Sequence, residues 1–272
     1  LGALLVIALT LTGAAAGNLN APSPFEVSYT VFQAVMVAEL VLVGAVAAAT
    51  AAGGISGERE RQTWEVLLTT RLPAWRIVTG KLVTAVQLAL WLVVASLPVF
   101  LPLFRFGAVS PGNLARILGI FLASGLAWAA IGLFFSALLK RTIAAVIASY
   151  ATASAWVILT IVARFVWDAI ENARSPLVGP GAPTGPVGPY LIELMNPLLI
   201  LLRTMSSPVV GLVDWMMSGG GTVAQPASLT LGARLAGALG PNGYYWVYIL
   251  SALALTAVLS ALTTRLIARR RA

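Results

Sequence analysis

Residues 55–81 read ISGERERQTWEVLLTTRLPAWRIVTGK and decide the fold, because this polar stretch lies between two long apolar runs. Charged residues make up only 10% of the chain, yet eight fall within these 27 positions. They are Glu58, Arg59, Glu60, Arg61, Glu65, Arg71, Arg76 and Lys81. Because charged side chains are costly inside a bilayer, we expect residues 55–81, here called the elbow, to lie in water beside the membrane.

The elbow is predicted to form two helices with a bend between them. Ser56 is a suitable N-cap for a helix that begins at Gly57, with acidic residues in its first turn, where they favour the helix dipole. Arg61 and Glu65 would then form an i,i+4 pair on an ionic face. Pro73 cannot continue this helix, but it suits the start of a second helix that runs into the next apolar segment. An apolar stripe is expected on the opposite face, formed by Trp64, Leu67, Leu68, Leu72 and Trp75.

The composition indicates a helical membrane protein. The chain has 272 residues, of which 59% are hydrophobic, and its mean hydropathy is +0.93. It contains no cysteine and no histidine, which excludes disulfides, thiolate or imidazole metal sites, and catalysis by either residue. The net charge of +8 is dispersed at the ends of apolar runs, so we expect membrane anchoring and no nucleic-acid partner.

The apolar runs predict a single transmembrane domain, residues 1–272, with six membrane-spanning helices. The first run is shorter than the roughly 20 residues that a span needs, so we expect further residues before Leu1. Pro98 and Pro102 are expected to kink or end the third span, and Gly53 and Gly54 to end the second. The spans are predicted near residues 1–16, 31–52, 82–104, 113–139, 143–167 and 243–267.

Lysine and arginine are densest in the elbow, in the turn at residues 140–142 and at the C-terminus. The positive-inside rule therefore predicts that the elbow and both termini are cytoplasmic. Residues 168–242 are predicted to be an extracytoplasmic segment with short helices that dip into the outer leaflet or pack on the bundle. A seventh span within residues 190–217 is the other reading, but it would send the C-terminal arginines outside.

Glu39 is an acidic residue near the middle of the second predicted span. Such a residue is expected to face the bundle interior or a water-filled cavity. We interpret Glu39 and Gln87 as candidates for a translocation path, and a hydrogen-bonded structural role for Glu39 stays open. Gln33 and Tyr150 are further possible partners of this acid.

The run from Glu58 to Leu68, followed by IVTGK at residues 77–81, resembles the loop after the second span of ABC-2 type permeases, the membrane subunits of ABC exporters. The family pattern is roughly GERExGTxExLL, then a Thr-Pro step, then IVxGK. Gln62 stands where glycine is usual, and Arg71 follows Thr70 where proline is usual. The resemblance implies an all-α protein with the architecture of type V exporters.

The resemblance also implies partners. We expect cytosolic ABC ATPase subunits, a second permease subunit that is identical or paralogous, and the lipid bilayer. Gly80 and Lys81 do not belong to a Walker A motif, because Leu82 replaces Ser or Thr and Trp75 stands where a glycine is required. We therefore expect no cofactor, metal or catalytic residue in this chain, with ATP and Mg²⁺ on the partner subunit. The ATPase-coupling residues are predicted to be Glu58, Arg59, Glu60, Arg61, Gln62, Thr63, Trp64, Glu65 and Leu68.

These expectations describe an exporter subunit in the cell (inner or plasma) membrane of a prokaryote, with several spans. The alternative is an ATP-independent secondary carrier that works through Glu39, although the sequence shows no convincing internal repeat. A membrane-embedded enzyme is disfavoured, because no cluster of His, Asp or Glu is found near a predicted membrane surface.

Overall fold

The computed structural model describes residues 24–64, 73–105, 111–174, 195–205 and 243–269. Within these ranges the regular structure is entirely helical. Five of the described helices are long and apolar enough to cross a membrane. The helices are α2 (Pro24–Glu60), α4 (Ala74–Arg105), α5 (Pro111–Leu138), α6 (Thr142–Arg174), α8 (Pro197–Met205) and α11 (Gly243–Arg269).

Helix α5 is the centre of the bundle and packs against each of the other described helices. In its most apolar window 61% of the residues are buried, the largest share among the five candidate spans. Phe121, Ile117 and Ile120 are among its fully buried side chains. A helix that is apolar all round belongs in such a position, because every face meets either lipid or another helix.

Small residues let α2 and α5 approach closely. The Trp128 ring of α5 lies directly against Gly44 of α2, so that a Cβ on this glycine would overlap it. A Cβ on Gly132 of α5 would lie 2.4 Å from the backbone oxygen of Ala48 on α2. Gly44 and Gly132 therefore serve helix packing, because the absence of a side chain lets the two helices approach closely.

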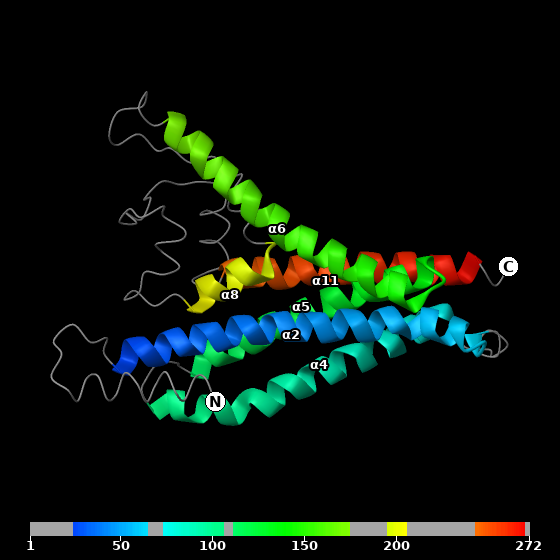
Figure 1. Cartoon of the computed structure of the whole chain (residues 1–272), viewed down its shortest axis with the longest axis horizontal. Helices are drawn as coiled ribbons and strands as arrows, with labels where there is room; N and C mark the ends of the chain where they lie inside the picture. Colours follow the sequence, from blue (N-terminus) through cyan, green and yellow to red (C-terminus); the bar gives the residue numbers. More distant parts are fainter. Residues whose placement is uncertain (1–23, 65–72, 106–110, 175–194, 206–242, 270–272) are drawn as a thin grey trace.

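Helix α6 leans away from the rest of the bundle toward its C-terminal end (Figure 1). Only 17% of its most apolar window is buried. The short helix α8 lies beside it and is held by Asn196, whose Nδ2 donates to Thr160 Oγ1 at 2.6 Å. The same Asn196 caps α8, because its Oδ1 accepts a hydrogen bond from Leu198 N at 2.8 Å, ahead of the favourable first-position Pro197.

The elbow, the α5–α6 turn and the C-terminal end of α11 lie at one end of the bundle (Figure 1). The three segments with the densest lysine and arginine therefore share one end of the bundle, and the cytoplasmic location of this end stays a prediction. Five predicted spans correspond to α2, α4, α5, α6 and α11, whereas the span predicted at residues 1–16 lies outside the described residues. One short helix, α8, is found in the predicted outer segment, most of which also lies outside the described ranges.

Two helices extend past features at which the sequence suggested a change. Helix α6 continues beyond residue 167, the predicted end of the fifth span, to Arg174. Helix α4 runs through Pro98 and Pro102 to Arg105, within one residue of the predicted end of the third span, so neither proline ends it. Backbone groups within a membrane have no water to bind, which favours continuous helices where the sequence alone indicates a break.

Candidate functional site at the elbow

Helix α2 ends in a tight left-handed corner. Gln62 has φ 58°, the left-handed conformation that glycine adopts most easily. Thr63 N donates to Glu58 O at 3.0 Å, and Gln62 N donates to Arg59 O at 3.1 Å. These two bonds define a Schellman motif with Gln62 in the position usually occupied by glycine. The glycine of the family pattern thus corresponds to the left-handed position of this motif, and in this chain Gln62 occupies that position.

The predicted helix start at Gly57 is wrong, because α2 continues without interruption from the membrane to Glu60. Ser56 is not an N-cap: it is fully buried, and its hydroxyl donates to Ala52 O at 2.7 Å within the helix. Gly54 does not end the helix, which runs through it to Glu60; a Cβ at this position would lie 3.5 Å from the Leu133 side chain and 3.6 Å from that of Lys81. Arg61 lies in the turn that follows, and Glu65 lies outside the described residues, so their predicted i,i+4 pair is not supported.

Ser136 joins the end of α2 to α5. Its Oγ accepts hydrogen bonds from Ile55 N and Ser56 N, both at 2.9 Å, and it is fully buried. The Ser136 hydroxyl in turn donates to Ser56 Oγ at 3.3 Å. A buried polar cluster of this kind fixes the two helices in one register, because leaving its groups unpaired would be costly.

The three charged residues at positions 58–60 each bind a different part of the bundle. Glu58 forms a salt bridge with Lys81 of α4. The guanidinium of Arg59 donates to Leu139 O and Ala137 O at the end of α5, both at 3.2 Å.

Glu60 reaches the first residue of α6, where its Oε1 accepts from Thr142 N at 2.8 Å and its Oε2 from Thr142 Oγ1 at 2.9 Å. A carboxylate in this position satisfies a free N–H group and favours the helix dipole. Together, residues 58–60 therefore connect α2 to α4, α5 and α6, so they do not form the free ionic face that the sequence indicated.

The accessible surface of the elbow includes the corner. Glu60, Arg61, Gln62 and Thr63 are exposed, whereas Trp64 is only 6% exposed and its ring lies 5.3 Å from the Arg59 guanidinium. On the other arm of the elbow the Trp75 side chain is 54% exposed.

The second elbow helix begins at Ala74, directly after Pro73, and continues as α4, as predicted. The predicted coupling residues Glu65 and Leu68 and most of the apolar stripe lie outside the described residues. Sequence reasoning also missed Ser136 and Thr142, which come close to the elbow only in the folded bundle.

Glu39 faces the bundle interior, as predicted, and is 7% exposed. The Ser96 hydroxyl of α4, which donates to Val93 O at 2.8 Å, lies beside its carboxyl group, and the sequence did not single out this neighbour. Gln87, the other predicted path residue, is exposed on α4. Tyr150 binds Ala45 O at 3.0 Å, and the Nε2 atom of buried Gln33 has no partner among the described residues. The structure therefore does not show Glu39 and Gln87 as a pair.

The comparison with known families agrees with the spans and the elbow. The model of the family described as ABC-2 family transporter protein matches residues 2–271. The chain belongs to this family. This ABC-2 protein is thus a membrane component of a transporter, which confirms the family predicted from the elbow motif. Members of the family associate with ATPase subunits and with the membrane. No curated protein matches the sequence.

Proposed function

We propose that this ABC-2 protein is the permease subunit of an ATP-driven exporter and that the elbow receives the movement of a cytosolic ATPase. The main support for this proposal is that the last residues of α2 bind α4, α5 and α6 through separate side chains. A displacement of the corner at residues 61–63 would therefore move three helices together. Charged residues at positions 58–60 serve to transmit the movement, and the exposed corner serves to contact the ATPase.

The rest of the assembly follows from the same proposal. Two permease subunits, identical or paralogous, enclose the path, and ATP binding and hydrolysis on the partner subunits switch it between the two sides of the membrane. The elbow and C-terminus are placed in the cytoplasm because the basic residues gather at that end of the bundle. The cell membrane of a prokaryote is the proposed location.

A photo-reactive amino acid at position 62 tests this proposal in native membranes. It should form an adduct with an ABC ATPase subunit, identified by its Walker A peptide, and the yield should change when ATP is added. The matched control is the same amino acid at Ala115, an exposed position near the start of α5 at the opposite end of the bundle. An ATPase adduct from position 115 but not from position 62 would refute the assignment.

A second candidate function rests on Glu39, because this acid is buried within the bundle, with Ser96 of α4 as a polar neighbour. An ATP-independent carrier would use such a carboxyl group to bind a proton or a cationic substrate. The purified chain alone, reconstituted in liposomes, would then dissipate a pH gradient, and Glu39→Gln would abolish this activity. If the gradient is stable with wild-type protein, the carrier hypothesis is rejected.

A further inference from the structure

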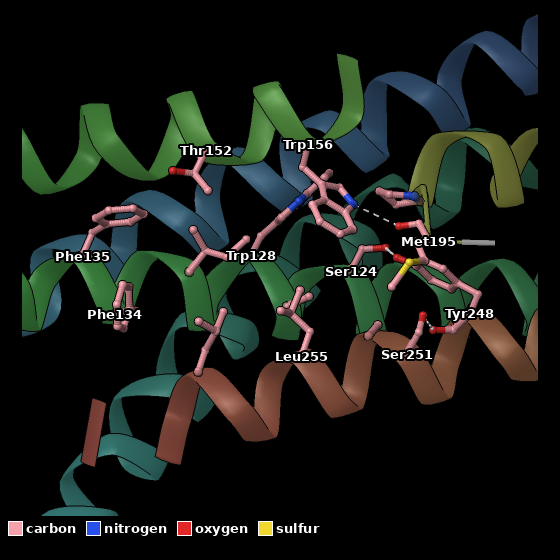
Figure 2. Close-up of a pocket in the computed structure, with 15 residues that line it drawn as sticks. Ser124, Trp128, Phe134, Phe135, Thr152, Trp156, Met195, Tyr248, Ser251 and Leu255 are labelled. Carbon is pink, nitrogen blue, oxygen red and sulfur yellow. Dashed lines mark hydrogen bonds between the residues drawn. The ribbon is translucent and has the colours of Figure 1, made fainter. Parts of the chain in front are cut away.

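A cavity of about 300 Å³ lies between α5, α6, α8 and α11, apart from the elbow and from Glu39. Five aromatic side chains contribute to its wall (Figure 2). Three of them, Trp128, Phe134 and Phe135, come from α5, Trp156 comes from α6, and Tyr248 comes from α11. A volume of this size is at the lower end of the range that is typical of ligand sites in proteins.

The lining offers no charged group to a ligand. Its hydroxyl groups are already bonded within the protein, as is the indole N–H of Trp156, which donates to Met195 O at 3.2 Å. Ser124 Oγ and Tyr248 OH lie 2.6 Å apart and form one hydrogen bond. The remaining hydroxyls belong to Thr152 and Ser251, and each donates at 2.8 Å to a backbone oxygen of its own helix. An occupant would therefore be held by apolar contact.

The cavity is elongated along the helices. Its lining on α5 extends from Ser124 to Phe135, and its lining on α11 extends from Tyr248 to Leu259. At the rise of an α-helix, each of these stretches covers about 16 Å. A volume of about 300 Å³ spread over that length is narrow, which suits an extended hydrocarbon chain better than a compact ring system.

The cavity lies between helices that cross the membrane. The helices that line it include three candidate spans, α5, α6 and α11. Helix α6 packs against α2 and α5, helix α11 packs against α5 and α4, and α6 and α11 make little contact with each other. In their most apolar windows only 17% and 22% of the residues are buried, so their outer faces are left to the bilayer. The solvent next to the space between α6 and α11 is therefore lipid hydrocarbon.

We propose that this cavity binds one acyl chain of a membrane phospholipid. The chain enters between α6 and α11 and packs against the aromatic side chains of α5. It fills the space that arises because α6 leans away from the bundle, and it is distinct from cargo in the translocation path. The proposal goes beyond the exporter function and does not depend on it.

A phospholipid with a photoactivatable group near the end of one acyl chain tests the proposal in reconstituted bilayers. Adducts mapped by mass spectrometry are expected on Phe135 and Leu255 inside the cavity, and also on Leu253, which is 43% exposed on α11. Ala252→Phe fills the cavity from α11 and should abolish the adducts on Phe135 and Leu255, while the adduct on Leu253 persists. Ala254→Phe is the matched control, because Ala254 is exposed on the same helix and this change should leave all three adducts.

Two results would overturn the proposal. The first is wild-type protein with adducts on Leu253 but none on Phe135 or Leu255, as expected if a second copy or residues 206–242 of the chain occupy the cavity. The second is an unchanged adduct pattern in a folded cavity-filling variant. If Ala252→Phe does not fold, Ser251→Phe gives the same test from a half-buried position of the lining.

Discussion

The close contact between α2 and α5 predicts that alanine is tolerated poorly at Gly132 of α5 and well at Gly80 of α4. A Cβ at Gly132 would lie 2.4 Å from Ala48 O and 3.1 Å from Ala52 N, both backbone atoms of α2. Ordinary contact begins at 3.4 Å, so the two helices must separate by about 1 Å to accept alanine at this position. Gly80 of α4 is the control, because a Cβ there would meet no atom within 4 Å.

Alanine is expected to change the stability of the protein in opposite directions at the two positions. Alanine in place of glycine stabilises a helix interior by about 0.5–1 kcal/mol, and this gain applies at both sites. Forcing extra atoms into a packed contact costs about 1–3 kcal/mol, and this cost applies only at Gly132. We therefore expect Gly80→Ala to stabilise the protein slightly and Gly132→Ala to destabilise it by about 1–2 kcal/mol.

The assay is unfolding of the purified protein in mixed micelles, titrated with sodium dodecyl sulfate and followed by tryptophan fluorescence. The midpoint should move to lower detergent fraction for Gly132→Ala and to equal or higher fraction for Gly80→Ala. Equal stability of the two variants would refute the reasoning, because it would mean that α2 and α5 separate without cost.

The remaining predictions concern the elbow. Gln62→Gly should stabilise the corner by about 1 kcal/mol, since glycine adopts the left-handed conformation without a Cβ clash, and Gln62→Val should destabilise it; the same detergent titration measures both. Ser136→Ala should lower the free energy of unfolding by about 1 kcal/mol, because the hydrogen bonds to the end of α2 are lost. Ser136→Thr keeps the hydroxyl group and is the control, with stability expected to equal that of the wild-type protein. Reversal of Glu58 to lysine or of Lys81 to glutamate should each reduce ATP-dependent transport, whereas the double reversal should recover most of it. Failure of the double variant to recover would show that the salt bridge does not account for the loss.

The spans were predictable from the sequence because length and apolarity decide whether a helix crosses a bilayer. The position of α4 directly after Pro73 was also predictable, since proline constrains the backbone locally. The inward orientation of Glu39 followed from the cost of an acid facing lipid. The position of Ser96 beside Glu39 could not be predicted, because the apolar pattern of two helices is compatible with many alignments of one helix along the other.

The predicted start of the elbow helix failed for a physical reason. Capping preferences describe what Ser56 and Glu58 do at a free helix end, but Ser56 is buried against α5 and bonded to Ser136, and α2 stays helical past this point. The roles of Glu58, Arg59 and Glu60 were hidden for a related reason. Their partners lie 23 to 82 positions away along the chain, and only the tertiary structure brings them together.

The two polar contacts between α2 and α4 have a consequence for biogenesis. Ser96 lies beside Glu39, and Lys81 pairs with Glu58, so both acids of α2 have a polar neighbour on α4. These two helices are synthesised before α5, the helix that packs against all the other described helices. The hairpin can therefore enter the bilayer as one unit before α5 is complete, because neither acid depends on α5 for its polar neighbour.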